Sequence, residues 1–138
     1  MRLVLDTNVV LSARLSRHGA SNALLQVVGD DRICMLASVP LFVEYEAVLT
    51  RPEQLIAMHT TAREVSKFLD ALAGMIEPVR LHYLWRPQLG DVADEMVLET
   101  AINGRAEAIV TFNQRHFEPA VRFGVDVMSP AETMRRLT

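Results

Sequence analysis

Short apolar runs alternate along the chain with longer stretches of helical periodicity. Leu3, Val4 and Leu5 are consecutive rather than separated by polar residues, which is typical of a strand buried on both faces. Later short apolar runs are also predicted to be strands, and the run at 77–83 is the weakest of these predictions. The pattern predicts strands at 2–7, 32–37, 77–83 and 106–112, with a short fifth strand at 125–129.

Helical periodicity fills the segments between these runs. Ser38 is a good N-cap and Pro40 suits a first turn, so we expect a helix from Ser38 that ends near Pro52. The predicted helices are 20–28, 38–51, 60–74 and 92–103, with a final helix that starts at Ser129 and Pro130. The segment after the first strand and the segment 84–91 are predicted to be loops.

Strands separated by helices make a mainly parallel α/β sheet of four to five strands the expected architecture. The chain has 138 residues, half of them hydrophobic, which is enough for one buried core and too little for two. No internal repeat or linker-like tract interrupts the pattern. We therefore expect a single domain over 1–138.

Net charge and cysteine content limit which binding partners and which cellular compartment we expect for the protein. The 14 Lys and Arg against 17 Asp and Glu give a net charge of -3. The chain therefore has no overall positive charge that would indicate binding to nucleic acid. Any polyanion would have to meet a local patch or bound cations. Cys34 is the single cysteine and lies in an apolar run, which fits a reducing, cytoplasmic setting. The N-terminus lacks signal-peptide features and no apolar run is long enough for a membrane span, so we expect a soluble protein.

Several acidic residues fall where ligands gather in such a sheet. Asp6 follows the first strand, and ligands collect at the carboxyl ends of parallel strands, although a turn or cap residue would look the same. Glu44 is flanked by apolar residues on its helix, or it is a solvated acid that the helix dipole favours. Asp91 and Asp94 begin a helix three residues apart, and an N-cap with a first-turn acid is the alternative.

If the strand at 106–112 is parallel to the first, its end places Thr111 and Asn113 beside Asp6 and the acids converge. Carboxylates in a small space repel one another and raise their pKa values unless a cation compensates. Carboxylate, amide and water oxygens suit Mg²⁺ or Mn²⁺, which also bind phosphate oxygens and activate water. The sequence therefore predicts metal-dependent hydrolysis of a phosphodiester by direct attack of water.

Three segments occur in a specific order and spacing: "LVLDTNVVLSA", "VPLFVEYEAVLTRPE" and "GDVADEMVLETAINGRAEAIVTFNQRHF". Together they resemble the PIN domain family over nearly the whole chain, in the branch of ribonuclease toxins of bacterial and archaeal toxin–antitoxin pairs. The resemblance implies a three-layer α/β/α sandwich that binds Mg²⁺ or Mn²⁺ and cleaves RNA. It also implies a homodimer and a small antitoxin protein as partner.

The resemblance assigns roles to individual residues. It implies that Asp6, Glu44 and Asp94 are the catalytic acids and metal ligands, with Asp91 as a supporting acid. Asn113 is a further candidate metal ligand. Asn8 and Thr111 match the polar residues that orient these carboxylates. The candidate contacts to RNA are Arg14, Arg17, Arg115 and His116, each of which can equally be an ordinary surface residue.

Two positions depart from the family pattern. Asn113 stands where many PIN domains have an aspartate, so it offers an oxygen without charge. His116 stands where the related pattern Asn-x-x-Asp-Phe has its acid. These departures leave open a PIN-like module that binds RNA or a protein without cutting. A phosphatase of the haloacid dehalogenase type is disfavoured, because it needs a second aspartate where this chain has Asn8.

Overall fold

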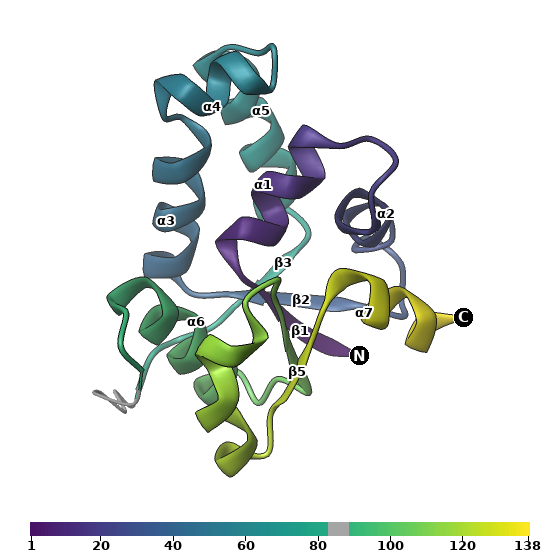
Figure 1. The fold of residues 1–138 in the computed structure, drawn as a ribbon, viewed down its shortest axis with the longest axis vertical. Helices are drawn as coiled ribbons and strands as arrows, with labels where there is room; N and C mark the ends of the chain where they lie inside the picture. The colour runs from purple at the N-terminus through teal and green to yellow at the C-terminus, as the bar shows by residue number, and fades with distance from the viewer. Residues whose placement is uncertain (83–88) are drawn as a thin grey trace.

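Within residues 1–82 and 89–138, the part of the chain that the computed structural model describes, five strands form one parallel sheet in the order β3-β2-β1-β4-β5 (Figure 1). The strands are β1 Arg2–Leu5, β2 Cys34–Ala37, β3 Ile76–Pro78, β4 Ala108–Val110 and β5 Asp126–Met128. The predicted parallel sheet and its fifth strand are confirmed.

β1 is the central strand, which explains its uninterrupted apolar run. Leu3 pairs with Met35 of β2 on one side and with Ala108 of β4 on the other. The edge strand β3 is shorter than predicted, because it ends at Pro78 rather than near 83. The backbone N–H of Val79 still donates to the carbonyl of Ala37 at 2.9 Å, but 79–82 lie outside the strand and residue 83 lies outside the described residues.

Helices fill the connections between the strands. They are α1 Thr7–Leu15, α2 Ala20–Gln26, α3 Val39–Leu49, α4 Pro52–Ala57, α5 Ala62–Ala73, α6 Val92–Asn103, the 3-10 segment η1 Gln114–Phe123 and α7 Pro130–Leu137. The helices α2, α3, α5, α6 and α7 confirm the five predicted ones. None of the helices in 1–82 or 89–138 has the length and apolar character needed to cross a bilayer.

Three helical segments were not predicted from the sequence. The prediction of a loop after β1 is wrong, because α1 begins there at once and buries Val9 and Val10 completely. Their branched side chains favour helix only weakly, so packing against the core decides the conformation. Pro52 does end α3, yet it also starts α4, where a first-turn proline loses no hydrogen bond. η1 contains Pro119 and a kink at Phe117, which hide any helical period.

The chain reverses direction across the sheet at β1. It moves from β1 through β2 to β3, and then places β4 and β5 on the other side of β1. Because crossovers between parallel strands are right-handed, this reversal puts α6 and η1 on the opposite face from α1 and α3, and Figure 1 shows helices on both sides of the sheet. The predicted α/β/α layers are confirmed. The reversal also makes the carboxyl ends of β1 and β4 a switch point, the place where open α/β sheets form a ligand-binding crevice.

Candidate active site

Asp6 lies at the switch point, directly after β1, and both of its carboxylate oxygens accept hydrogen bonds. Oδ1 accepts from the backbone N–H of Thr7 at 2.8 Å, which makes Asp6 the N-cap of α1. Oδ2 accepts from the hydroxyl of Thr111 at 2.7 Å. The residue is only 7% exposed, and its backbone N–H donates to the carbonyl of Val110 at 2.9 Å. Asp6 therefore caps a helix and also stands at the switch point.

Thr111 connects the end of β4 to the end of β1. It is completely buried, and its hydroxyl oxygen accepts a hydrogen bond of 3.0 Å from the backbone N–H of Asn113. The hydroxyl thus donates its hydrogen to Asp6 and accepts a hydrogen bond from the turn that leads into η1. This arrangement fixes the carboxylate of Asp6 relative to that turn.

Burial raises the pKa of the Asp6 carboxyl above its usual range, because a buried carboxylate loses hydration. The hydrogen bonds from Thr111 and Thr7 lower the pKa in part, and so does the nearby imidazole of His116. The charge of Asp91 raises it further. The hydrogen bonds to Asp6 therefore offset only part of the cost of burying its ionised carboxylate.

Asp91 and Asp94 stand at the N-terminus of α6. Asp91 is the N-cap, since its Oδ1 accepts from the backbone N–H groups of Ala93 at 2.7 Å and Asp94 at 3.2 Å. The side chain of Asp94 is 15% exposed. Burial raises the pKa of Asp94, and the charges of Asp6 and Asp91 raise it further. The three acids lie close enough to repel one another, although they come from opposite ends of the chain.

His116 faces Asp94 from the first turn of η1. Its Nδ1 lies 3.2 Å from Oδ2 of Asp94, and the pair lowers the pKa of Asp94 in part. A pocket of about 450 Å³ opens beside them. It is lined by Leu89, Gly90, Asp91, Asp94, Arg115, His116, Glu118 and Pro119. This acid pocket is therefore bounded by α6 on one side and by η1 on the other.

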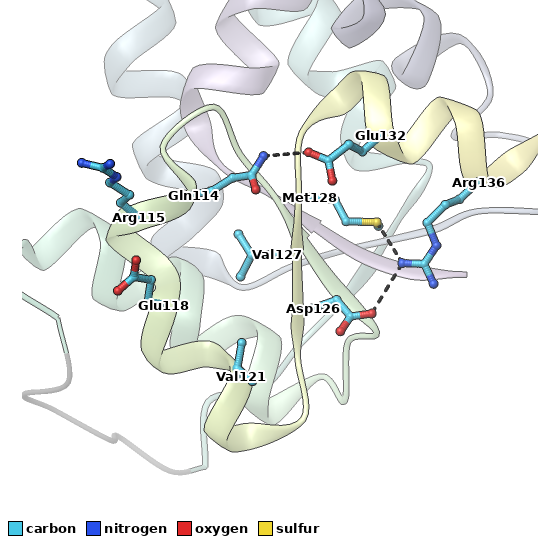
Figure 2. Close-up of a pocket in the computed structure, with 9 residues that line it drawn as sticks. All are labelled: Gln114, Arg115, Glu118, Val121, Asp126, Val127, Met128, Glu132 and Arg136. Carbon is cyan, nitrogen blue, oxygen red and sulfur yellow. Dashed lines mark hydrogen bonds and ion pairs between the residues drawn. The ribbon is translucent and has the colours of Figure 1, made fainter.

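A second pocket of about 510 Å³ adjoins the acid pocket and shares Arg115 and Glu118 with it. Figure 2 shows it between η1, β5 and α7, with the side chains of opposite elements joined in pairs. Gln114 donates to Glu132 at 2.9 Å, and this bond lowers the pKa of Glu132. Arg136 lies 3.5 Å from a carboxylate oxygen of Asp126. The second pocket therefore lacks Asp91 and Asp94, and its acids Glu132 and Asp126 have polar or basic partners.

The helix α3 contributes one residue to this region that the sequence did not single out. The hydroxyl of Tyr45 donates to the carbonyl of Leu5, the residue before Asp6. Tyr45 is completely buried, and that burial raises its pKa. It falls on the apolar stripe of α3, so the pattern predicted only core. The signal was its hydroxyl, because a buried tyrosine usually needs a hydrogen-bond partner.

Three other predicted site residues come from α3, from α1 and from the turn after β4. Glu44 is half-buried on α3, a helix that contacts α6. Asn8 is in the first turn of α1, and its Oδ1 is a buried oxygen without a hydrogen-bond partner among the described residues. Asn113 is exposed in the turn after β4. Their roles as ligand or orienting residues stay predictions.

The predicted RNA contacts divide into two groups. Arg115 and His116 line the acid pocket. Arg14 lies in the last turn of α1, not in a loop as predicted, and its guanidinium stacks 4.6 Å from the ring centre of Phe68. Arg17 follows that helix. The two arginines therefore lie at the opposite end of α1 from Asp6, about 13 Å away along a nine-residue helix.

Asp94, which lines the acid pocket, and Asp6, which does not line it, together fit a divalent ion held mainly by water. Among the described residues, no three Asp, Glu, His or Cys side chains are close enough to hold an ion as they stand. Mg²⁺ often binds through only one or two carboxylates and keeps several waters. Asp6 and Asp94 offer two such oxygen ligands. Burial first and neighbouring acids second raise the pKa of each, and a nearby cation would favour the ionised forms.

A family model for the PIN domain matches residues 2–115. The chain belongs to the PIN domain family. The matched range of this PIN domain includes Asp6, Glu44, Asp94 and Thr111, and it ends directly before His116.

This PIN domain also shares its fold with a solved structure, the crystal structure of VapBC2 from Rickettsia felis bound to a DNA fragment from their promoter. The superposition covers 92% of this chain and 98% of that chain, with 13% sequence identity and a TM-score of 0.60. A similarity at that level of identity supports the fold alone. A search of curated protein sequences finds no match to the chain.

Proposed function

We propose that this PIN domain is an endoribonuclease that requires Mg²⁺ or Mn²⁺ and hydrolyses phosphodiester bonds of RNA. The observation that carries the proposal is the approach of Asp6 and Asp94 at the switch point, where burial and acidic neighbours raise both pKa values. Membership of the PIN domain family supports nuclease chemistry. Together these features favour an ion-dependent hydrolase over a purely structural acid cluster.

The acidic and polar residues in and around the acid pocket would have different roles. Asp6 and Asp94 would hold the ion, with Glu44, Asp91 and Asn113 as the other candidate ligands. When bound, a divalent ion supplies an acidified water and stabilises charge on the phosphate. Thr111 would keep the carboxylate of Asp6 in a fixed orientation through its 2.7 Å hydrogen bond. Asn8 is a second candidate for that orienting role.

The basic side chains would bind the phosphate backbone of the RNA. Arg115 and His116 line the acid pocket and would contact phosphates next to the cleaved bond. Arg14 and Arg17, at the far end of α1, would contact a more distant stretch. Such contacts add affinity without sequence preference. They would provide local positive charge on a chain whose overall charge is -3.

We further propose that the chain is the toxin of a toxin–antitoxin pair and has a small antitoxin as partner. The three motif segments and the fold shared with VapBC2 support this proposal. An antitoxin arginine placed against Asp6 and Asp94 would block the pocket, because a guanidinium pairs with carboxylates through two hydrogen bonds. The homodimer and the cytoplasmic setting stay predictions.

A second candidate function is a module that binds RNA or a protein without cutting. Two positions favour it: Asn113 is an amide and His116 an imidazole where related domains have acids. The remaining acids would then hold an ion weakly or not at all. The pocket would serve for recognition only.

The test is cleavage of a mixed pool of end-labelled RNAs by EDTA-treated protein with Mg²⁺ or Mn²⁺ restored. We expect cleavage that EDTA abolishes and that Asp6→Asn and Asp94→Asn each reduce by at least about a hundredfold. Asp31→Asn is the matched control, because Asp31 is exposed before β2, at the opposite edge of the sheet. That variant should cut like the parent protein.

Other results would point elsewhere. RNA that is bound but not cut with either ion would favour the binding module. In that case, cleavage gained by His116→Asp would identify the lost acid. Cleavage that survives both EDTA and Asp6→Asn would exclude the proposed mechanism.

A further inference from the structure

The contact between His116 and Asp94 brings a nitrogen ligand to a pocket of otherwise oxygen ligands. Nδ1 of His116 lies 3.2 Å from Oδ2 of Asp94, and the histidine side chain is 57% exposed. The backbone N–H of His116 donates to the carbonyl of Asn113 at 3.0 Å, which anchors this turn to the end of β4. His116 is therefore held at the pocket by its backbone, while its ring is open to solvent.

The separation of the two atoms matches that of neighbouring ligands on one ion. Ligand atoms bind an octahedral ion at about 2.1 Å, so adjacent ligands at a right angle lie about 3 Å apart. The distance between Nδ1 and Oδ2 is therefore compatible with both atoms binding one ion. An imidazole nitrogen without a proton can bind a metal ion through its lone pair.

The charges around the pair also favour an ion there. Asp6 and Asp91 both raise the pKa of Asp94, so negative charge is in excess on the α6 side. Arg115 and Glu118 line the η1 side of the same pocket and largely offset each other. The three carboxylates carry three negative charges, so a bound divalent ion would offset most of this excess.

We propose that His116 is a direct ligand of the ion held by Asp94 and that it biases this site toward transition-metal ions over Mg²⁺. This inference rests on the proposed function, because it concerns the same ion. Imidazole nitrogen binds transition-metal ions well, whereas Mg²⁺ prefers oxygen ligands. The histidine thus takes the position of an acid and changes which ion is preferred, rather than simply weakening the site.

The test measures the ion itself and not cleavage. The full chain is stripped with EDTA and titrated with Mn²⁺, followed by electron paramagnetic resonance, and Mg²⁺ is then added as competitor. Pulsed measurements on the Mn²⁺-loaded protein detect coupling to a directly bound nitrogen. We expect nitrogen coupling in the parent protein and its loss in His116→Asp and His116→Asn.

The preference between ions should change together with the coupling. His116→Asp should lower the ratio of Mg²⁺ to Mn²⁺ dissociation constants by on the order of tenfold, because an oxygen replaces the nitrogen. His18→Asp is the control, since it makes the same chemical change at an exposed site beyond the far end of α1. It should leave both the coupling and the ratio unaltered.

Each contrary result has a distinct meaning. Mn²⁺ that binds without nitrogen coupling, with an unchanged ratio in His116→Asp, would overturn this inference and leave the proposed function in place. His116 would then act only as a counter-charge to Asp94. If no ion binds to the parent protein, both the inference and the proposed nuclease fail.

Discussion

The hydroxyl of Thr111 donates a 2.7 Å hydrogen bond to Oδ2 of Asp6 across 105 positions of the chain. Both residues follow directly on their strands, β4 and β1, which are neighbours in the sheet. The bond therefore closes the switch point with side chains at the place where the backbone pairing of the two strands ends. It joins the fold to the candidate chemistry, because the same carboxylate is a proposed ion ligand.

Replacing Thr111 with valine should both destabilise the protein and disturb Asp6. Valine has a similar shape but no hydroxyl, so Oδ2 of Asp6 loses its donor and the N–H of Asn113 loses its acceptor. We expect a loss of about 1–3 kcal/mol in the free energy of unfolding, measured by urea denaturation. The pKa of Asp6 should rise further, which carboxyl-detected NMR can follow, because the Thr111 bond normally lowers it.

Thr133→Val is the control for this prediction. Thr133 is equally buried, but its hydroxyl donates to the carbonyl of Ser129, which already accepts a backbone bond in α7. Its loss should therefore cost less and leave the pKa of Asp6 unchanged. Equal effects of the two variants would mean that Thr111 is merely a buried residue and not a positioning one.

Asp6→Asn should stabilise the protein at neutral pH when divalent ions are absent. The pKa of Asp6 is raised on folding, mainly by burial, so the folded state binds more protons than the unfolded state between the two pKa values. The free energy of unfolding therefore falls as the pH rises through this window, and the loss persists above it. Asparagine does not titrate, so the variant should be more stable at pH 7 by about 1 kcal/mol.

The geometry allows this exchange. The amide oxygen of asparagine can accept from the N–H of Thr7, and its NH₂ can donate to the hydroxyl oxygen of Thr111, whose own hydrogen then loses the acceptor it has in the parent. Denaturation in EDTA from pH 3 to 7.5 should show the two proteins converging at the acid end. A variant that is less stable than the parent at pH 7 would show that the ionised carboxylate stabilises the fold.

Much of the sheet follows from local pattern. Leu3, Val4 and Leu5 are consecutive because β1 is paired on both edges and covered on both faces, and that environment leaves a clear mark on the sequence. α1 left no such mark, because its Val9 and Val10 favour strands and become helical only through packing. η1 was missed for a related reason, since Pro119 and a kink at Phe117 break its period.

The candidate site divides in the same way. The nearness of Asp6, Asp91 and Asp94 was predictable, because the carboxyl ends of parallel strands and the helix starts beside them meet at one edge of a sheet. The contact of His116 with Asp94 was not, since it depends on the path of η1. The place of Arg14 was misjudged because it required knowing that α1 is a helix. The local sequence pattern thus predicts which edge of the sheet has the candidate site, but it does not predict all the side chains that line that site.

Gly104→Ala should destabilise the joint between α6 and the sheet. A Cβ at Gly104 would lie 2.8 Å from Cγ2 of Val79, 2.9 Å from the carbonyl oxygen of Thr100 and 3.1 Å from Cδ1 of Leu36. Such crowding typically costs about 1–3 kcal/mol. Urea denaturation measures the loss, and Gly74→Ala serves as the matched change.

Gly74 also ends a helix, α5, but a Cβ there would be 3.5 Å from its nearest neighbour, the carbonyl oxygen of Ala71. Its backbone is right-handed helical, with φ of -68°, so alanine should be neutral or stabilising by up to about 1 kcal/mol. Equal losses in the two variants would show that the contacts of Gly104 relax without strain.

A divalent ion should raise the Tm of the parent protein but not of Asp94→Asn. An ion that binds only the folded state stabilises it by about 2.7 kcal/mol at a hundredfold excess over its Kd. For a domain of this size, that corresponds to an increase of roughly 5–10 °C, which EDTA should reverse. The shift should be largely lost in Asp94→Asn, because one of the two proposed ligand carboxylates is gone. Thermal unfolding with Mn²⁺ and then with EDTA measures it.

Asp31→Asn is the control that distinguishes ion binding at the switch point from ion binding at the opposite edge of the sheet. Asp30, Asp31 and Glu77 line a pocket there that also carries negative charge. If Mn²⁺ binds at the switch point, Asp31→Asn keeps the full increase in Tm while Asp94→Asn loses it. The reverse pattern would place the ion at the amino ends of the strands, away from Asp6, and would remove the main support for an ion-dependent nuclease. Because both variants delete one carboxylate, general charge effects on the Tm cancel in the comparison.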